Sequence, residues 1–532
     1  MGAHDRGPQD PSRRRLLIGG AATIAGLAIG CSGDDEESAT TSTAGGASTT
    51  RPPPDLPSDP FTLGVASGDP RTDSVILWTR LALEPVADDG LGGMPDEPID
   101  VRWEIATDEA FSALVGEGTG TAEPAFAHTV HVDAAGLDPA TDYHYRFHVG
   151  EHTSPAGRTR TLPEGSPDAF GIAVVNCQWF ETGAYAAYRH LLDEPIDLVV
   201  HLGDYIYEYA GATEGARQTK PAHELESLAD YRLRYASYRL DEDLRAAHAR
   251  FPFVLTWDDH EVSNNYSADG LALEPDPDVA RARKTAAYRA WWEHLPVRFD
   301  PPDGPELDVH QALDVGDLAR IYLLDQRQHA DAPPCRGEAT AAGDFGDCAA
   351  RTGDVDRSLL GAEQEAWLAE AASTSAATWN LLGSPLFLAG VNGGSDADGD
   401  KYYVDSWDGF PAARLRLIEL LAEMENPVVL TGDYHAGMVL DVHGHPFEDS
   451  PIVAPEFMAP AISSPLFPAD VSGRTPHLRQ QLNEHGYLTV AVEPERLTVQ
   501  FRILDAVADP ASNISTASTW TVNAGDPVTV QS

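Results

Sequence analysis

The spacing of hydrophobic and polar residues differs between the two halves of the chain. From Phe170 onward, strand-like apolar runs alternate with segments of helical periodicity, which are Ala184–Leu192, Leu228–Ala246, Pro277–His294, Gly361–Ala371 and Pro411–Glu423. The strand-like runs include Leu318–Leu324, Trp379–Leu382, Val428–Leu430 and Leu488–Val492. Strands that alternate with helices predict a layered α/β domain. We place this domain at residues 164–510, which leaves 511–532 as a C-terminal tail.

Residues 59–163 have the pattern of an all-β module. Short runs of alternating polarity, such as His128–Val132 and Tyr143–Val149, recur between Pro, Gly and Asp residues. The segment Leu137–Phe147 resembles the last strands of a fibronectin type III sandwich, where a Tyr near the strand start anchors a corner. We therefore expect a small fibronectin- or Ig-like β-sandwich ahead of the α/β domain.

Residues 1–30 have the pattern of an export signal, in which the twin-arginine-like Ser12–Leu17 precedes the apolar run Ile18–Ile29. That run is too short to span a bilayer, which takes about 20 residues. It ends at Cys31 in a segment that resembles a bacterial lipoprotein cleavage box. We expect an exported protein, either a cell-surface lipoprotein held at the membrane only through lipid on Cys31, or a secreted or periplasmic one. The polar residues 31–58 predict a disordered linker.

Composition adds limits on the protein's partners. A hydrophobic share of 42% and a charged share of 23% fit a globular protein, and 532 residues are enough for two or three domains. The formal charge of −48 argues against a nucleic-acid-binding surface, because such a surface must attract phosphate. We expect a monomer. Cys335 and Cys348 bracket a Gly/Ala/Asp-rich loop, and their spacing suits a disulfide in an oxidising compartment.

Four short segments carry the candidate chemistry. They are NCQ (Asn176–Gln178), GDYIYE (Gly203–Glu208), WDDHE (Trp257–Glu261) and TGDYHAG (Thr431–Gly437). Each places a potential metal ligand just past a strand-like run: Cys177, Asp204, Asp259 and Asp433. In open α/β sheets, sites form at the carboxyl ends of strands. The segments therefore predict one polymetal hydrolytic centre.

The residue types in these segments suit metal binding. The adjacent carboxylates of WDDHE would repel one another without cations. A carboxylate such as Asp204 can bridge two cations about 3.5–4 Å apart, and the phenolate of Tyr207 suits Fe³⁺. Asp433 and His435 stand at i and i+2, so they point the same way in extended chain. Each motif alone also fits an ordinary turn or strand end, and the prediction rests on their occurrence in one domain.

These motifs together resemble the alkaline phosphatase D family of the calcineurin-like metallophosphatase superfamily, which includes phospholipase D-like members. The resemblance extends from about Phe61 to Leu504 and includes FTLGVASGDP (Phe61–Pro70), WDGFPAAR (Trp407–Arg414) and APEFMAPAISSP (Ala454–Pro465). It implies a β-sandwich followed by a four-layer α/β/β/α metallophosphatase sandwich, and a centre that holds Fe³⁺ and Ca²⁺. The implied reaction is hydrolysis of a small phosphoester by a metal-bound hydroxide.

The resemblance also implies the ligands of each ion. Cys177 and Tyr207 would bind Fe³⁺, and Asp204 would bridge Fe³⁺ to Ca²⁺. Asp259 stands where the superfamily motif GNH[DE] has its Asn, and an oxygen ligand there suits Ca²⁺. Asp433, in the later GD-x-H segment, would be a further ligand.

Three residues are implied as catalytic. His260 matches the His of GNH[DE], proposed to protonate the leaving group, while His435 would lie near the metals and contact phosphate. Arg327, in LDQRQH, would stabilise the phosphate oxyanion. The chain departs from the family pattern at Gly383-Ser384-Pro385 and at Gln328-His329, and both departures bear on substrate preference.

Other readings stay open at this point. A phospholipase D-like phosphodiesterase would use the same centre on diesters. An esterase loaded with zinc or manganese in place of iron would be colourless. A non-enzymatic surface lipoprotein would bind ligands or cell wall with a decayed site, and the intact motif set weighs against it.

Overall fold

The computed structural model of the chain describes residues 55–532, except 212–216, 269, 272–273, 275, 335–344, 347–354, 395, 398 and 468–469. The expected export signal, the lipidation site Cys31, most of the linker and the pair Cys335 and Cys348 therefore lie outside the described residues. Within the described ranges, none of the helices combines the length and the apolar character needed to cross a membrane.

The larger of the two main sheets has ten strands. In spatial order these are β24 (Asp526–Gln531), β23 (Ile514–Asn523), β22 (Arg496–Leu504), β21 (Gly486–Val492), β9 (Phe170–Val175), β10 (Leu198–Leu202), β11 (Pro252–Thr256), β1 (Val65–Gly68), β2 (Ser74–Arg80) and β5 (Thr129–Ala135). β9, β10 and β11 are parallel, and nearly every residue in them is buried. Burial on both faces explains why these strands read as continuous apolar runs.

The second main sheet has seven strands. Their order is β12 (Gln311–Val315), β13 (Ala319–Leu323), β15 (Trp379–Ser384), β17 (Pro427–Thr431), β19 (Ile452–Met458), β18 (Gly437–His443) and β20 (Leu478–Leu482). β13, β15, β17 and β19 run parallel to their neighbours in this series. The carboxyl ends of these strands therefore lie along one edge, as in the larger sheet.

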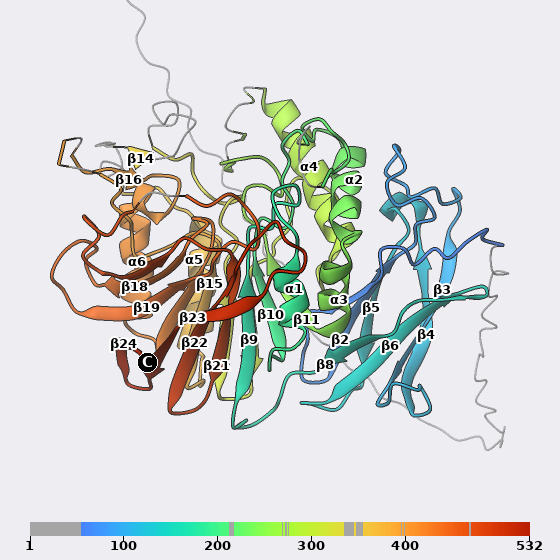
Figure 1. Cartoon of the computed structure of the whole chain (residues 1–532), viewed down its shortest axis with the longest axis horizontal. Helices are drawn as coiled ribbons and strands as arrows, with labels where there is room; N and C mark the ends of the chain where they lie inside the picture. Colours follow the sequence, from blue (N-terminus) through green and yellow to red (C-terminus); the bar gives the residue numbers. More distant parts are fainter. Residues whose placement is uncertain are drawn as a thin grey trace, which may run out of the picture. The chain divides into compact units, whose positions relative to one another are not determined.

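The two main sheets share a hydrophobic core, to which Val174 and Val200 contribute from one sheet and Leu323, Leu381 and Leu430 from the other. The outer face of the larger sheet packs against the helices α1 (Ala186–Leu191), α2 (Leu228–Arg239), α3 (Glu242–Arg250) and α4 (Pro277–His294). The smaller sheet packs against α5 (Gly361–Ser373) and α6 (Pro411–Leu421). The fold is therefore of the α/β class, with helices beside sheets (Figure 1).

One predicted helix, Leu228–Ala246, forms as two. Ser227 caps α2 in a capping box with Asp230, and Asp241 begins α3 by accepting a hydrogen bond from the backbone of Leu244. Because an Asp at an N-cap satisfies free backbone N–H groups, the chain can start a second helix in the middle of one continuous apolar pattern.

The N-terminal strands belong to two sheets. A smaller sheet consists of β4 (Leu114–Ala122), β3 (Ile99–Ala106), β6 (Asp142–Val149) and β7 (His152–Thr153), with β8 (Gly157–Arg160) paired to β6. Its inward side chains share a core with β1, β2 and β5, while β1 also pairs in parallel with β11. The hydroxyl of Tyr143 accepts a hydrogen bond from the backbone of Asp138 at 2.8 Å, as the fibronectin-like pattern led us to expect.

Short elements complete the described structure. They are the 3-10 helices η1 (Pro124–Phe126) and η3 (Trp407–Gly409) and the two-stranded pair β14 (Phe345–Gly346) and β16 (Tyr402–Tyr403).

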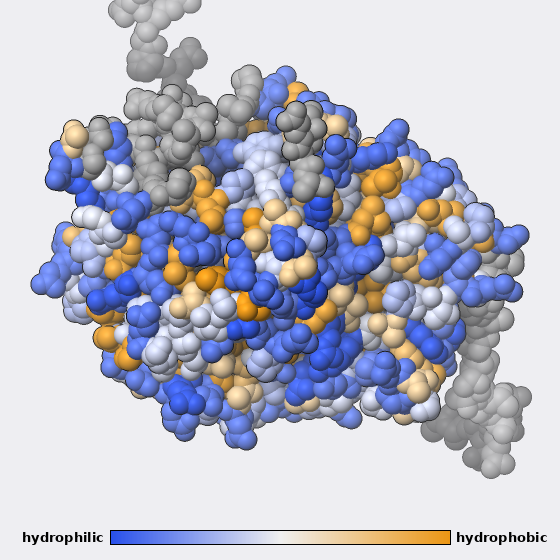
Figure 2. All heavy atoms as spheres, viewed as in Figure 1, coloured by the Kyte–Doolittle hydropathy of each residue, from blue (hydrophilic) through white to orange (hydrophobic). Residues whose placement is uncertain are grey.

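The expected C-terminal tail, 511–532, is corrected by the structure. Residues in it form β23 and β24, which continue the ten-stranded sheet beyond β22. Trp520 and Val522 alternate with polar residues and pack into the core between the sheets, and β23 pairs with β22 along its length. The space-filling view shows hydrophobic residues in small groups between hydrophilic ones on the face that it presents (Figure 2).

Candidate metal centre

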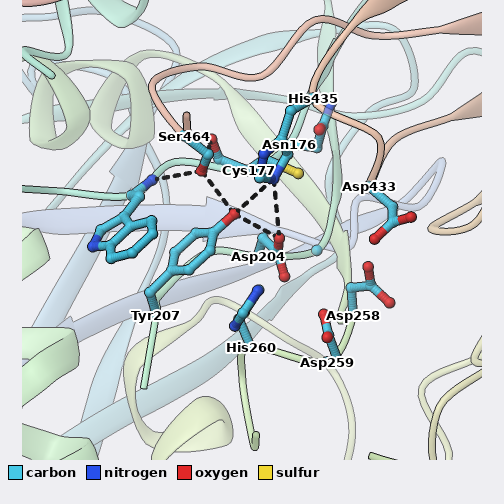
Figure 3. Close-up of polar contacts among 12 residues, drawn as sticks. Asn176, Cys177, Asp204, Tyr207, Asp258, Asp259, His260, Asp433, His435 and Ser464 are labelled. Carbon is cyan, nitrogen blue, oxygen red and sulfur yellow. Dashed lines mark hydrogen bonds and ion pairs between the residues drawn. The ribbon is translucent and has the colours of Figure 1, made fainter. Parts of the chain in front are cut away.

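The four predicted segments meet at the carboxyl ends of strands from both main sheets. Cys177 lies two residues beyond β9, Asp204 two beyond β10 and Asp259 three beyond β11. Asp433 lies two residues beyond β17 of the smaller sheet. Because the two sheets share one core, their strand ends bring these side chains together (Figure 3).

Four residues of these segments have a left-handed backbone conformation. Cys177, Asp204, Asp433 and His435 all adopt positive φ, at 53°, 56°, 64° and 55°. This conformation costs on the order of 1–3 kcal/mol for a non-glycine residue, and it clusters at functional sites. At Gly203 a Cβ atom would lie 2.5 Å from the backbone nitrogen of Asp258, so glycine is required for the two strand ends to approach.

One part of the centre has a thiol and a phenol. Cys177, Asp204 and His435 each offer a ligand atom within 4.8 Å of the others. The hydroxyl of Tyr207 donates to Oδ2 of Asp204 at 2.7 Å and lies 3.2 Å from Nε2 of His435. Ser464 donates to the same hydroxyl at 2.7 Å. These contacts put a sulfur, a phenolic oxygen, a carboxylate and an imidazole around one point.

The other part of the centre is rich in carboxylates. Asp204, Asp259 and His260 form a second group within 4.8 Å, and Asp258, Asp259 and Asp433 form a third. Asp204 is shared by the first two groups, and Asp259 by the last two. Figure 3 shows Asp204 between the Cys177 side and the side with Asp258, Asp259 and Asp433. The arrangement therefore suits a row of cations joined by bridging carboxylates.

The donor set fits metal ions. One carboxylate oxygen on each of Asp204, Asp258, Asp259 and Asp433 is buried and has no hydrogen-bond partner among the described residues. Burial, followed by the Asp204 carboxylate, raises the pKa of the Cys177 thiol well above its ordinary value. Burial also raises the pKa of Asp258 to about 8, with the nearby Arg327 opposing it. So many unpaired buried acceptors need positive charge from cations.

Arg327 enters the carboxylate side of the centre and is almost fully buried. Its Nε donates to Asp258 and its Nη1 to Asp405, both at 2.5 Å. Nη2 has no hydrogen-bond partner among the described residues and lies 3.8 Å from Asp259 and 3.7 Å from Asp433. The guanidinium is thus fixed by two contacts and keeps one nitrogen for a further anion.

His260 is held by a carboxylate from the neighbouring segment. Its Nδ1 lies 2.7 Å from Oε2 of Glu208. Burial alone would lower the pKa of His260, but the carboxylates of Asp259, Asp204 and Glu208 together raise it well above the ordinary value. With Nδ1 engaged by Glu208, the other ring nitrogen is left for the centre.

The buried side chain of Glu261 holds the loops that follow β10 and β11. Glu261 accepts backbone hydrogen bonds from Asp204 at 3.1 Å, Tyr205 at 2.6 Å and Asp258 at 2.9 Å. One carboxylate therefore fixes the ends of both β10 and β11. Three backbone N–H groups donate to it, although burial and the Asp204 carboxylate raise the pKa of Glu261 well above its ordinary value.

The structure thus brings together every metal and catalytic residue named from the sequence. Sequence reasoning did not select Asp258, Glu208 or Ser464, which take part in the contacts above. Asp258 and Glu208 stand inside the WDDHE and GDYIYE segments, so their positions were a usable signal. Ser464 lies far along the chain, and only the fold brings it to Tyr207.

Comparisons with known proteins agree with this geometry. Residues 172–501 match the family described as PhoD-like phosphatase, and residues 46–163 match its N-terminal domain. The chain is 40% identical to alkaline phosphatase D of Bacillus subtilis (strain 168) over 95% of this chain and 87% of that protein. A solved structure titled "Structure of PhoD" superposes with a TM-score of 0.84 at 39% identity and covers 90% of this chain and 93% of that one. The chain belongs to the PhoD-like phosphatase family and is a phosphoric ester hydrolase with a metal cofactor.

Proposed function

We propose that this hydrolase acts on small phosphoesters at a centre of Fe³⁺ and Ca²⁺. The observation that carries the proposal is the run of three overlapping ligand groups, with Asp204 and Asp259 as shared members. In this proposal Cys177 and Tyr207 bind Fe³⁺, because a thiolate and a phenolate suit a highly charged ion. Asp204, which belongs to two ligand groups, would be the ligand that the iron shares with the neighbouring Ca²⁺.

The calcium ligands come from the oxygen-rich side of the centre. Ca²⁺ takes oxygen ligands, and we assign Asp259 and Asp433 to it. His435 has its Nδ1 2.7 Å from the carbonyl oxygen of Pro465, so this nitrogen carries the proton. Nε2, which lies 3.2 Å from the Tyr207 hydroxyl, then has its lone pair on the side of the centre, and we assign the ring to a contact with phosphate.

When bound, the cations would lower the pKa of a water molecule and neutralise charge on the phosphate. The chain's own residues orient and stabilise the substrate. Arg327 donates from Nη2 to a phosphate oxygen, because its other contacts to Asp258 and Asp405 hold the guanidinium still. A donor that is fixed before the reaction needs no reorganisation as charge develops.

Leaving-group departure is assigned to His260. Glu208 holds Nδ1, so the proton on Nε2 is aimed at the centre and can pass to the leaving oxygen. No side-chain nucleophile is needed in this reaction. The acidic surface, with a formal charge of −48, repels anionic substrates at long range, and the cations reverse the field locally.

We extend the proposal to architecture and location. The cores on each face of the two main sheets support a four-layer α/β/β/α metallophosphatase sandwich at 164–510, preceded by a fibronectin- or Ig-like β-sandwich at 59–163. The twin-arginine and lipoprotein-like residues 1–31 support export, with lipid on Cys31 as the anchor. We propose a monomer without a nucleic-acid-binding surface.

Two measurements test the function. Elemental analysis of protein purified from its native export route should find iron and calcium, and the protein should absorb visible light through the phenolate–iron bond. A colourless, iron-free and active preparation would instead indicate a zinc or manganese esterase. Turnover of a mono-aryl against a bis-aryl phosphate then separates a phosphomonoesterase from a phospholipase D-like phosphodiesterase. Protein loaded with metal that hydrolyses neither ester contradicts the proposal.

A further inference from the structure

A separate group of metal-binding side chains lies outside the centre. Asp308, His310 and His329 each offer one ligand atom, and these atoms lie within 4.8 Å of one another. Asp308 and His329 line an open cavity of about 690 Å³. None of these three residues takes part in the contacts of the metal centre.

Two segments form this group, and their backbone brings the side chains together. In the segment before β12, Leu307 and Val309 are buried while Asp308 and His310 point outward. Residues two apart in extended chain share a face, so the carboxylate and the imidazole point the same way. His329 comes from the turn that follows β13, where its backbone N–H bonds to the carbonyl of Gln326 at 3.1 Å.

The two segments are tied to each other without any ion. The side chain of Gln328 accepts from the backbone nitrogen of Leu307 at 3.4 Å and donates to its carbonyl oxygen at 2.7 Å. These paired bonds hold the turn of His329 against the segment of Asp308 and His310. A ligand set that is already in place binds a cation without a large ordering cost.

The two imidazoles are partly buried and are held by different neighbours. The ring of His310 packs on Trp367 with centroids 4.5 Å apart, and its Nδ1 has no hydrogen-bond partner among the residues that the structure describes. Nε2 of His329 lies 3.5 Å from Oδ2 of the buried Asp325 and 4.0 Å from Oδ1 of Asp308. Carboxylates on this side of the ring add the negative potential that a cation needs.

We propose that Asp308, His310 and His329 bind one Zn²⁺ ion at the rim of this cavity, separate from the centre at Asp204. Two imidazoles and one carboxylate suit zinc and argue against Ca²⁺, which takes six to eight oxygen ligands. Ligand atoms around tetrahedral Zn²⁺ lie about 3.3 Å apart, so no pair in this group must close by more than about 1.5 Å. The Asp308 side chain is 79% exposed and can rotate to do so.

The zinc would lie between two segments that Gln328 already ties together. It would join the segment of Asp308 and His310 to the turn Gln326–His329, which also carries Arg327 two residues before His329. With three protein ligands, the ion would keep a fourth position for a water molecule from the cavity that Asp308 and His329 line. Zinc binding at Asp308, His310 and His329 shares no ligand with the main centre, so it does not depend on which metals that centre holds.

The test counts zinc in the exported protein with its main centre intact. The protein is dialysed against micromolar Zn²⁺, and bound metals are measured by mass spectrometry. We expect one more zinc per chain in the wild type than in His329→Ala or Asp308→Asn. Loss of one ligand should weaken zinc binding by at least about tenfold, and the calcium and iron contents should not change.

The matched control is His223→Ala. His223 is also a surface histidine beside a carboxylate, because its Nε2 lies 3.1 Å from Asp230, but it belongs to no ligand group among the described residues. This variant should keep the full zinc content. If circular dichroism shows that His329→Ala is unfolded, the zinc content of Asp308→Asn decides the question. The Asp308 side chain is largely exposed, so this substitution should not disturb folding. Equal zinc in wild type and Asp308→Asn, or no zinc in either, overturns the proposal.

Discussion

The main centre and the Asp308 site offer similar ligand types in opposite surroundings. In the centre the ligand residues are all buried, and four carboxylate oxygens have no partner among the described residues. At the rim of the cavity, Asp308 is exposed and both histidines are only partly buried. Water can solvate the second group when no ion is present, whereas the first group has almost no water to replace a cation. Burial therefore decides how strongly each part of the protein depends on its metal.

The largest effect should follow from removing the bridging carboxylate of the centre. Asp204→Ala should abolish phosphoester hydrolysis and release metal, because Asp204 belongs to two ligand groups at once. The fold should survive, since the side chain lies at strand ends rather than in the core between the sheets. Activity assays, elemental analysis and circular dichroism check this together. Retained turnover would remove Asp204 from the mechanism.

The next effect concerns the proton donor. His260→Gln should lower kcat by about 10²–10⁴-fold, the range for loss of a general acid. The substrate test is direct: an ester with a good leaving group, such as a nitrophenyl phosphate, should lose less activity than an alkyl ester. His223→Ala serves again as the control, with unchanged kcat. An equal loss on both esters would indicate that His260 holds the structure or a metal instead.

Asp69, a buried carboxylate that belongs to no ligand group among the described residues, sharpens the comparison. Burial raises the pKa of Asp69 to about 6 from 3.8, although a backbone N–H of Arg298 and the side chain of Gln311 donate to it. The folded chain then holds the proton more tightly than the unfolded one. Stability from this group is complete below about pH 4 and is lost as pH rises through 6.

Asp69→Asn should remove this pH dependence. The shift corresponds to about 3 kcal/mol, since one pKa unit is about 1.4 kcal/mol. Urea unfolding of wild type and variant at several pH values between 4 and 7 measures it. The wild type should lose stability relative to the variant across that window. If the free energies of unfolding of the two proteins change with pH in parallel, Asp69 ionises with an ordinary pKa. Burial would then not predict how costly an ionised carboxylate is in this protein.

The smallest effect is expected at the rim. Asp308→Asn should change phosphoester turnover by less than about twofold, as is usual for a surface substitution away from the reacting atoms. Thermal unfolding with and without Zn²⁺ should show that the ion raises Tm in the wild type but not in this variant. A loss of activity comparable to that of Asp204→Ala would mean that the two sites are not independent.

Much of the fold followed from local patterns. The predicted helix Pro277–His294 has the same bounds in the structure, and Trp379–Leu382 lies inside β15. The split of Leu228–Ala246 was missed because the apolar pattern continues through Asp241, and a single capping residue overrides it. β24 was missed because its side chains are largely exposed and carry little hydrophobic pattern.

Local sequence patterns identified only some of the residues of the metal centre. An apolar run followed by Asp or Cys marks a strand end, so Cys177, Asp204 and Asp433 could be selected from sequence. Ser464 stands 257 residues from Tyr207, and no local signal links the two. The same holds for the rim, where the pairing of β12 with β13 and the paired bonds of Gln328 bring His329 to Asp308.

The sequence by itself determined the element types, the strand ends that carry the ligands, and the family to which the chain belongs. Those features depend on periodicity and residue type, which act over a few neighbouring positions. Only the tertiary structure decided that Asp204 is shared between ligand groups and that a second ligand set exists at Asp308. The same is true of Nη2 of Arg327, which has no hydrogen-bond partner in the described part of the chain. Distances between residues far apart in the chain depend on how two sheets pack, and packing is a property of the whole molecule.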